Sequence, residues 1–287
     1  MKMKKMQLKK SINLVPSLFT TGGLFFAFFS IVRSINGDHH TAAWAILFAS
    51  FCDAVDGRIA RMTKTQSDFG KEYDSLVDLS SFGLAPAILM YTWTLSGFRP
   101  VGWFLAFLFF ACAALRLARF NVQASPDRQE KKEKKLKFSG LPTPGAACLL
   151  ATFVLFHEAV LGIESPVKSV AALVMMPLLA VLMVSNVRYR SFKEYNIQRS
   201  NYFYILIGAA MVIGLIAINP NIVLFGGFLV YTLSGPVMWL LQLRQLRAET
   251  VPERGDKTKT KGRRFTVIPM NGNDGEARRE DYERQNG

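Results

Sequence analysis

Long apolar runs recur along the chain, and many of them are as long as a membrane is thick. A helix needs roughly 20 mostly apolar residues to cross the hydrocarbon core of a bilayer. The sequence therefore predicts an all-α, polytopic membrane helix bundle rather than a soluble domain with a large core. We expect about eight transmembrane helices, at about 12–34, 41–62, 71–95, 100–121, 143–163, 167–186, 201–219 and 221–243.

The basic residues indicate how such a bundle is oriented. The chain carries 35 lysines and arginines against 21 acidic residues, a net charge of +14. If the N-terminus lies inside, all but three of these basic residues fall on the same side of the membrane, the exceptions being Arg33, Arg99 and Lys168. The positive-inside rule then places both termini in the cytoplasm. This pattern explains the positive charge without a nucleic-acid partner, and it suits anionic membrane lipids.

Three regions follow from this reading. Residues 1–11 form a basic cytoplasmic N-terminus, and residues 12–243 form the transmembrane domain. Residues 244–287 are polar and basic, which predicts a disordered cytoplasmic tail. The three cysteines, Cys52, Cys112 and Cys148, all fall within predicted spans, which argues against a disulfide framework.

Four aspartates stand out in the facing ends of the second and third predicted spans. Asp53 and Asp56 are three residues apart, and Asp74 and Asp78 are four apart, so each pair shares one helix face. A short connection makes the two helices antiparallel neighbours. We therefore expect the two acidic faces to point at each other in the cytoplasmic half of the membrane.

Such a cluster of acids is costly to bury unless cations compensate for it. An ionised carboxylate within a membrane costs several kcal/mol when it is unpaired. Hard oxygen ligands suit Mg²⁺ or Mn²⁺, and the segment holds no set of histidines and cysteines for zinc. The neighbouring Gly57 and Ala60 are small, which leaves room for a nucleotide or for a partner helix. A hydrated salt-bridge network at the membrane edge is the other interpretation of the same residues.

The complete spacing of this segment resembles the signature of the CDP-alcohol phosphotransferase family. The resemblance implies an integral membrane enzyme that displaces CMP from a CDP-linked lipid with an alcohol. It implies that Asp53, Asp56 and Asp74 bind two divalent metal ions, either Mg²⁺ or Mn²⁺. Asp78 would be the general base and a further metal ligand. Asp56, Gly57, Ala60, Arg61 and Gly70 would bind the nucleotide. The matching residues are Asp53-x2-Asp56-Gly57-x2-Ala60-Arg61-x8-Gly70-x3-Asp74-x3-Asp78.

Three further segments are similar to one branch of that family, which transfers a phosphatidyl group from CDP-diacylglycerol to L-serine. They are "NLVPSLFTTGGL" at 13–24, "ALRLARFN" at 114–121 and "FSGLPTPGAA" at 138–147. Arg116 and Arg119 would then capture the phosphate of the lipid or the serine carboxylate, and Asn121 would hold the amino acid. The two arginines are equally compatible with membrane anchors that reach the headgroups. The resemblance also implies a homodimer. We expect the protein in the inner membrane with its active site facing the cytoplasm.

Two alternatives stay open at this point. The first keeps the chemistry but uses another acceptor: glycerol 3-phosphate, an inositol phosphate or choline. The second is an ion transporter with a carboxylate-lined path, although the acids gather at one face and no inverted repeat is visible. The histidines, His39, His40 and His157, fall near the outer face, where we expect them at the surface and away from the acids.

Overall fold

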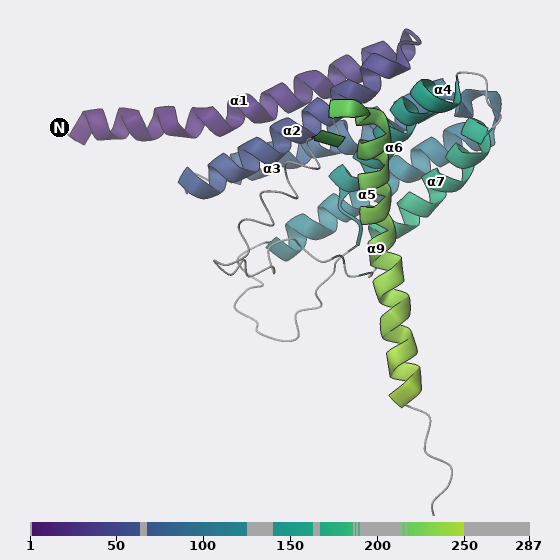
Figure 1. The fold of residues 1–287 in the computed structure, drawn as a ribbon. Helices are drawn as coiled ribbons and strands as arrows, with labels where there is room; N and C mark the ends of the chain where they lie inside the picture. The colour runs from purple at the N-terminus through teal and green to yellow at the C-terminus, as the bar shows by residue number, and fades with distance from the viewer. Residues whose placement is uncertain are drawn as a thin grey trace, which may run out of the picture. The chain divides into compact units, whose positions relative to one another are not determined.

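The structure is a computed structural model that describes residues 2–63, 68–124, 140–162, 167–185, 187, 189, 214–215 and 217–249. All regular secondary structure in these ranges is helical, as the apolar runs predicted. Figure 1 shows the helices as a bundle of long rods. Their bounds are α1 (Lys2–Ile35), α2 (His39–Thr63), α3 (Asp68–Asp78), η1 (Leu79–Leu84), α4 (Ala85–Trp93), η2 (Leu95–Gly97), α5 (Val101–Ala124), α6 (Thr143–Phe156), η4 (His157–Leu161), α7 (Val167–Val184) and α9 (Pro220–Glu249).

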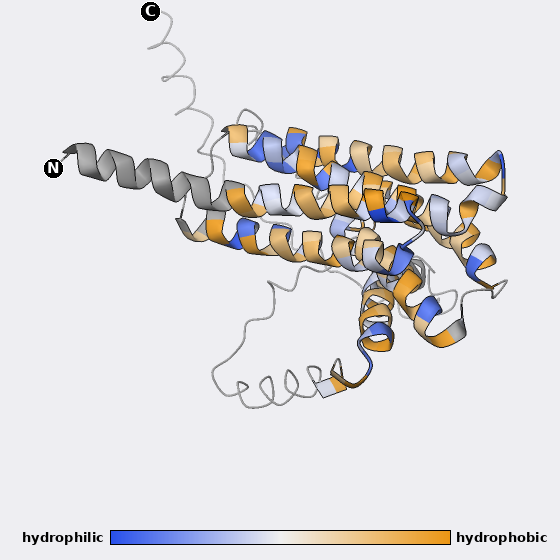
Figure 2. Cartoon of the chain, turned by 90° about the horizontal axis from the view of Figure 1, so that it is seen from above, coloured by the Kyte–Doolittle hydropathy of each residue, from blue (hydrophilic) through white to orange (hydrophobic). Residues whose placement is uncertain are grey.

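Six helical stretches in the described residues are long and apolar enough to cross a membrane. They are Leu18–Ile35, Phe69–Trp93, Val101–Gln123, Thr143–Val160, Val167–Val184 and Pro220–Leu241. Figure 2 shows hydrophobic residues over most of the length of these helices. Helix α2 has 25 residues, enough for a crossing by length, but the charges that follow Cys52 lower its hydropathy. The span predicted at 201–219 lies almost entirely outside the described residues, so the structure supports a multi-pass membrane protein without fixing the number of spans at eight.

Helices α1 and α2 form an antiparallel hairpin with a tight connection. The chain turns at Gly37, whose φ of +83° is in the left-handed region that glycine adopts without strain. Asp38 then caps α2, because its Oδ1 accepts a hydrogen bond from the backbone amide of Thr41 over 3.1 Å. Ser30 of α1 donates to the carbonyl of Ala42 over 2.9 Å, which ties the two helices together in the buried region. The hairpin thus places the middle of α1, around Thr20 and Gly23, beside the part of α2 that holds Cys52 and Asp56.

The third predicted span is a continuous helix that changes from α-helical to π-helical and back to α-helical. Helix α3 continues into the π-helical turn η1 and then into α4, which ends at Trp93. The π-helical turn packs against α5: a Cβ added at Gly83 would lie 3.3 Å from the Cβ of Ala113. A π-helical turn widens the helix by one residue and often occurs at functional sites. Here it begins directly after Asp78.

Helix α6 lies at the centre of the hydrophobic core. Every residue from Gly145 to Leu155 is buried, so this helix meets other protein on all sides. It packs against α2, α4, α5 and α7, and Phe156 stacks on Phe225 of α9 with ring centroids 4.9 Å apart. A helix that is hydrophobic all round belongs in such a position. The other helices are arranged around it and expose large apolar side chains, as expected where lipid replaces water.

The segment before α6 is held tightly to the end of α7. The backbone amide of Leu141 donates to the carbonyl of Leu182 over 3.0 Å. A Cβ at Gly140 would clash with the carbonyl oxygen of Met183, so no other residue fits there without movement of the backbone. This docking fixes where α6 begins.

The chain divides into two compact units, Met1–Arg244 and Gln245–Gly287. The first unit holds the helices described above. The second begins with the last turn of α9 and is otherwise outside the described residues, as is the predicted disordered tail. The three cysteines are free thiols, as their positions predicted.

One expectation about the histidines is wrong. His157 does not lie at the surface, because its side chain is fully buried. Its ring meets the Trp93 ring edge-on with centroids 5.3 Å apart. Its position near a helix end predicted exposure, but η4 turns the ring inward against α4.

Candidate active site

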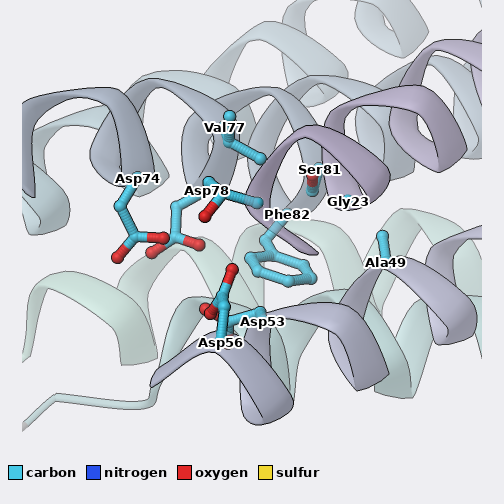
Figure 3. Close-up of a pocket in the computed structure, with 10 residues that line it drawn as sticks. Gly23, Ala49, Asp53, Asp56, Asp74, Val77, Asp78, Ser81 and Phe82 are labelled. Atoms are coloured by element: carbon cyan, nitrogen blue, oxygen red, sulfur yellow. The ribbon is translucent and has the colours of Figure 1, made fainter. Parts of the chain in front are cut away.

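Three of the four aspartates converge between α2 and α3. One carboxylate oxygen from each of Asp53, Asp56 and Asp74 lies within 4.8 Å of the other two. Asp56 is 4% exposed, and Asp53 and Asp74 are half-buried. Figure 3 shows Asp78 beside Asp74, with both carboxylates directed toward Asp53 and Asp56 on the facing helix. The helix faces that the spacing predicted to meet do meet, while the roles of these residues stay a prediction.

The geometry of the three acids fits a hard divalent cation. Two oxygens bound to one Mg²⁺ lie at most about 4.2 Å apart, which is twice the metal–oxygen distance. The observed upper limit of 4.8 Å is close enough for small side-chain rotations to reach this geometry. The donors are all carboxylates, the ligand type that Mg²⁺ and Mn²⁺ prefer. This acidic cluster can therefore hold metal.

The charges in this cluster act on one another. The carboxylate of Asp78 is close enough to those of Asp53, Asp56 and Asp74 to feel their charges, and Arg116 of α5 opposes them. Like charges so close together are unfavourable in a medium of low dielectric. A bound cation would relieve the repulsion, which is a second reason for this cluster to hold one.

Helix α1 contributes a residue that the spacing analysis missed. The hydroxyl of Thr20 donates a hydrogen bond to the carboxylate of Asp56, and Thr20 is itself buried. This bond restricts the rotation of Asp56 and so orients one of the candidate metal ligands. The available signal was the segment "NLVPSLFTTGGL", but nothing in its spacing tells which of its side chains faces α2.

The acids open onto a small hollow between α1, α2 and the α3–η1 junction. About 180 Å³ of space that no atom occupies, part of it open to solvent, lies between the residues of this narrow hollow. Gly23 forms part of its wall because a Cβ there would lie 3.6 Å from Cγ1 of Val77, which lets α1 approach closely. The hollow is thus acidic on one side and apolar on the other, and the residues that line it are Thr20, Gly23, Ala49, Asp53, Asp56, Asp74, Val77, Asp78, Ser81 and Phe82.

The predicted nucleotide-binding residues lie one to two turns from the acids. Gly57 follows Asp56 and has open space on its Cα, since no atom lies within 4 Å of a Cβ added there. Gly70 is half-buried in the first turn of α3. Ala60 and Arg61 belong to the last turns of α2, and their side chains are outside the described part of the structure. The space beside Gly57 is compatible with the predicted nucleotide.

The three residues predicted to bind substrate lie at different places on α5. Arg116 is directed into the bundle, where its Nη1 donates to Oγ1 of Thr143 over 3.0 Å. Asn121 donates from Nδ2 to Oγ of Ser75 on α3 over 2.8 Å. Arg119 is exposed. Arg116, whose charge acts on Asp78, and Asn121, which bonds the residue after Asp74, therefore both lie near the acids. Arg119 suits a contact with lipid headgroups or with the lipid substrate.

Comparison with known proteins agrees with this geometry. The sequence profile of the CDP-alcohol phosphatidyltransferase family matches residues 13–216. A CDP-diacylglycerol–serine O-phosphatidyltransferase of Helicobacter pylori is 33% identical over 229 residues, which cover 80% of this chain and 92% of that protein. The protein of the same name from Bacillus subtilis is 30% identical over 185 residues, covering 64% of this chain and 94% of that protein. An archaetidylserine synthase of Methanothermobacter thermautotrophicus is 35% identical over 177 residues, covering 61% of this chain and 69% of that protein.

The chain therefore belongs to the CDP-alcohol phosphatidyltransferase family. The matched region contains the four aspartates, α1 from residue 13 onward and every described helix from α2 to α7. Membership explains why a membrane protein gathers four acids in one hollow, and it favours a transferase over the ion transporter that the sequence left open.

Proposed function

We propose that this protein transfers the phosphatidyl group of CDP-diacylglycerol to the hydroxyl of L-serine and releases CMP, a step of phospholipid synthesis. The serine oxygen forms a new bond to the phosphorus that carries diacylglycerol. The bond from that phosphorus to the oxygen bridging to CMP breaks, and CMP leaves with its phosphate. The serine proton passes to a base of the protein.

Asp53, Asp56 and Asp74 are the residues that would hold a divalent cation, Mg²⁺ or Mn²⁺, with two ions as the expected number. When bound, such ions neutralise the pyrophosphate and stabilise the negative charge that develops on CMP as it leaves. Thr20 keeps the Asp56 carboxylate in place. Gly57 and Gly70, with Ala60 and Arg61, would border the nucleotide.

Asp78 is the residue proposed to take the serine proton. It lies one helical turn beyond Asp74, in the same hollow, and it is partly buried. A hydroxyl is a weak nucleophile at neutral pH, so it needs a base within hydrogen-bond reach as it attacks. Asp78 can serve as a metal ligand as well, because it faces the other three acids.

Arg116 is the basic group best placed to hold a negative charge of a substrate beside Asp78. Its charge acts on Asp78, and one face of its guanidinium is held by Thr143. Its Nε is buried and has no hydrogen-bond partner in the described residues, so this N–H is available to donate a hydrogen bond to a substrate oxygen. We assign it the serine carboxylate or the lipid phosphate, with Asn121 and Arg119 farther along α5 toward the membrane surface.

The observation that carries the proposal is the convergence of Asp53, Asp56 and Asp74 within 4.8 Å in a member of this family. The choice of serine is supported by the names of the relatives from Helicobacter pylori and Bacillus subtilis, which specify that acceptor. Glycerol 3-phosphate, an inositol phosphate and choline are the alternative acceptors that the test includes.

The experiment is an acceptor panel with the purified full-length protein. CMP release from CDP-diacylglycerol is measured in Mg²⁺ or Mn²⁺ with L-serine, glycerol 3-phosphate, inositol phosphate or choline. We expect rapid CMP release with L-serine and none with the other three acceptors. Rapid release with another acceptor and none with L-serine would retain the family chemistry and reject serine as the substrate.

We also propose that the protein is a homodimer in the inner membrane, with residues 1–11 and 244–287 and the active site on the cytoplasmic side. The distribution of lysines and arginines supports this orientation. In a variant without native cysteines, Lys131→Cys should resist an impermeant thiol reagent applied to intact cells. Asn36→Cys, in the exposed turn after α1, should react. The reverse pattern would contradict the orientation.

A further inference from the structure

Ser81 has a buried hydroxyl that the reaction described so far does not use. The residue is 1% exposed, and its Oγ has no hydrogen-bond partner among the described residues. Leaving a buried hydroxyl unpaired costs about 1–3 kcal/mol. Buried polar groups are nearly always paired in native proteins, so an unpaired one points to a missing partner.

Two serines on the same helical segment show how such a hydroxyl is normally satisfied. Ser75 donates to the carbonyl of Lys71 over 3.0 Å, and Ser80 donates to the carbonyl of Leu76 over 2.9 Å. This bond to the preceding turn is open to any helical serine. Ser81 does not make it, although it follows Ser80 directly.

The location of Ser81 indicates what its partner is. Ser81 lines the same hollow as the four aspartates and lies three residues after Asp78, in the π-helical turn η1. Figure 3 shows it among the residues of this hollow, on the segment that carries Val77 and Asp78. Three residues correspond to about 4.5 Å along a helix axis. A small ligand whose hydroxyl meets Asp78 therefore has its next polar group within reach of Ser81.

We propose that the hydroxyl of Ser81 binds the ammonium group of the acceptor amino acid, an inference that rests on the proposed function. No basic residue lines the hollow, so no side chain there offers a positive charge to a carboxylate beside Ser81, whereas the carboxylate of Asp78 is available to an ammonium. The Oγ of Ser81 accepts a hydrogen bond from the ammonium, which satisfies the oxygen. In L-serine two carbons separate the ammonium from the reacting hydroxyl. This short separation matches the short distance along the helix from Asp78 to Ser81.

This contact separates acceptors by their chemistry. An alcohol with an ammonium on the neighbouring carbon gains the bond to Ser81. Glycerol 3-phosphate has no such group and gains no bond of this kind. Ser81 is thus a substrate-binding residue that favours an amino alcohol over a phosphorylated one.

The test measures KM for each substrate separately in the purified full-length protein. Ser81→Ala should raise KM for L-serine at least about tenfold, the change expected for loss of one hydrogen bond to a charged group. KM for CDP-diacylglycerol should stay within about twofold. Ser80→Ala is the matched control, because it removes a neighbouring hydroxyl that is outside the hollow, and both KM values should be unchanged. If Ser81→Ala does not purify, Ser81→Cys is used in its place, because cysteine keeps the side-chain volume of serine.

A second measurement identifies the group that Ser81 contacts. 3-Hydroxypropionate has the hydroxyl and carboxylate of serine but lacks the ammonium, and it is used as a competitive inhibitor. Its inhibition constant should be the same for the wild type and Ser81→Ala. An equal rise for this inhibitor and for L-serine, a change in KM for CDP-diacylglycerol alone, or no change at all would overturn the assignment. If the wild type does not use L-serine, the proposed function itself fails, which the acceptor panel reveals before any variant is made.

Discussion

Arg116 of α5 donates a hydrogen bond from Nη1 to Oγ1 of Thr143, the first residue of α6, over 3.0 Å. Thr143 is 1% exposed, so this bond is shielded from water. It joins two segments that are more than twenty residues apart in sequence, and it holds the guanidinium on the side of the bundle where Asp78 lies. Thr143 is therefore a positioning residue for a basic group that acts on Asp78.

Replacing Thr143 with valine should reduce kcat/KM about tenfold. Valine keeps the volume of threonine but offers no oxygen, and a hydrogen bond to a charged group is worth about 1.5–3 kcal/mol. Thr143→Ser retains the oxygen and should keep most of the activity. Thermal unfolding of both variants distinguishes a loss of orientation from a loss of fold. Equal activity of the valine and serine variants would show that Arg116 needs no support from α6.

Removal of divalent cations should abolish turnover. In excess EDTA the protein should release no CMP, and added Mg²⁺ or Mn²⁺ should restore the activity. Full turnover in EDTA would contradict a metal site formed by Asp53, Asp56 and Asp74.

Loss of a single ligand should weaken metal binding. Asp53→Asn and Asp74→Asn each remove one charged oxygen, so the cation concentration for half-maximal activity should rise at least about tenfold. Glu72→Gln is the control, because Glu72 is an exposed acid on α3 outside the hollow. The same shift in the control variant would mean that general surface charge, and not the cluster, determines the metal requirement.

The cap on α2 should contribute measurably to stability. Asp38→Ala removes the acceptor for the amide of Thr41, and loss of such a cap costs about 0.5–2 kcal/mol. Asp38→Asn still caps the helix and should be close to the wild type. Thermal unfolding in detergent measures the difference.

The same cap predicts a dependence on pH. Burial alone would raise the pKa of Asp38, but hydrogen bonds from the backbone and side chain of Thr41, with the charge of Arg33, outweigh burial and lower this pKa. A lowered pKa in the folded state means that the ionised form stabilises the fold above the unfolded-state pKa. This stabilisation is lost as the pH falls through the folded-state pKa. The stability difference between the wild type and Asp38→Ala should therefore shrink in acid, and a difference that grows in acid would contradict the cap.

The fold could be predicted to the extent that it depends on apolar length. The runs that became α1, α5, α7 and α9 are continuous, so each identifies its helix. The break in the third span could not be predicted, because "LSSFGL" at 79–84 contains no residue that demands a π-helical turn. The burial of His157 was missed because sequence position gives the depth of a residue along a helix but not the face that its neighbours cover.

The candidate site could be predicted in part for the same physical reason. Asp53 and Asp74 belong to helices joined by a short connection, so their spacing alone places them on facing surfaces. Thr20 and Ser81 escaped prediction because their roles depend on how α1 and η1 are rotated, which local sequence does not determine. Arg116 was identified from the sequence segment "ALRLARFN" that contains it. Its hydrogen bond to Thr143 could not be predicted, because it depends on how α5 and α6 pack.

The most direct test of the central account is the turnover of Asp78→Asn with L-serine. Asparagine keeps the size of aspartate and removes its basicity, and general base catalysis is typically worth about 10²–10⁴-fold in rate. CMP release is measured at saturating CDP-diacylglycerol and Mg²⁺, and binding of CDP-diacylglycerol is measured in parallel. The account predicts a fall in turnover of at least about 10²-fold with lipid binding retained. Turnover close to that of the wild type would contradict it, because Asp78 would then not accept the serine proton.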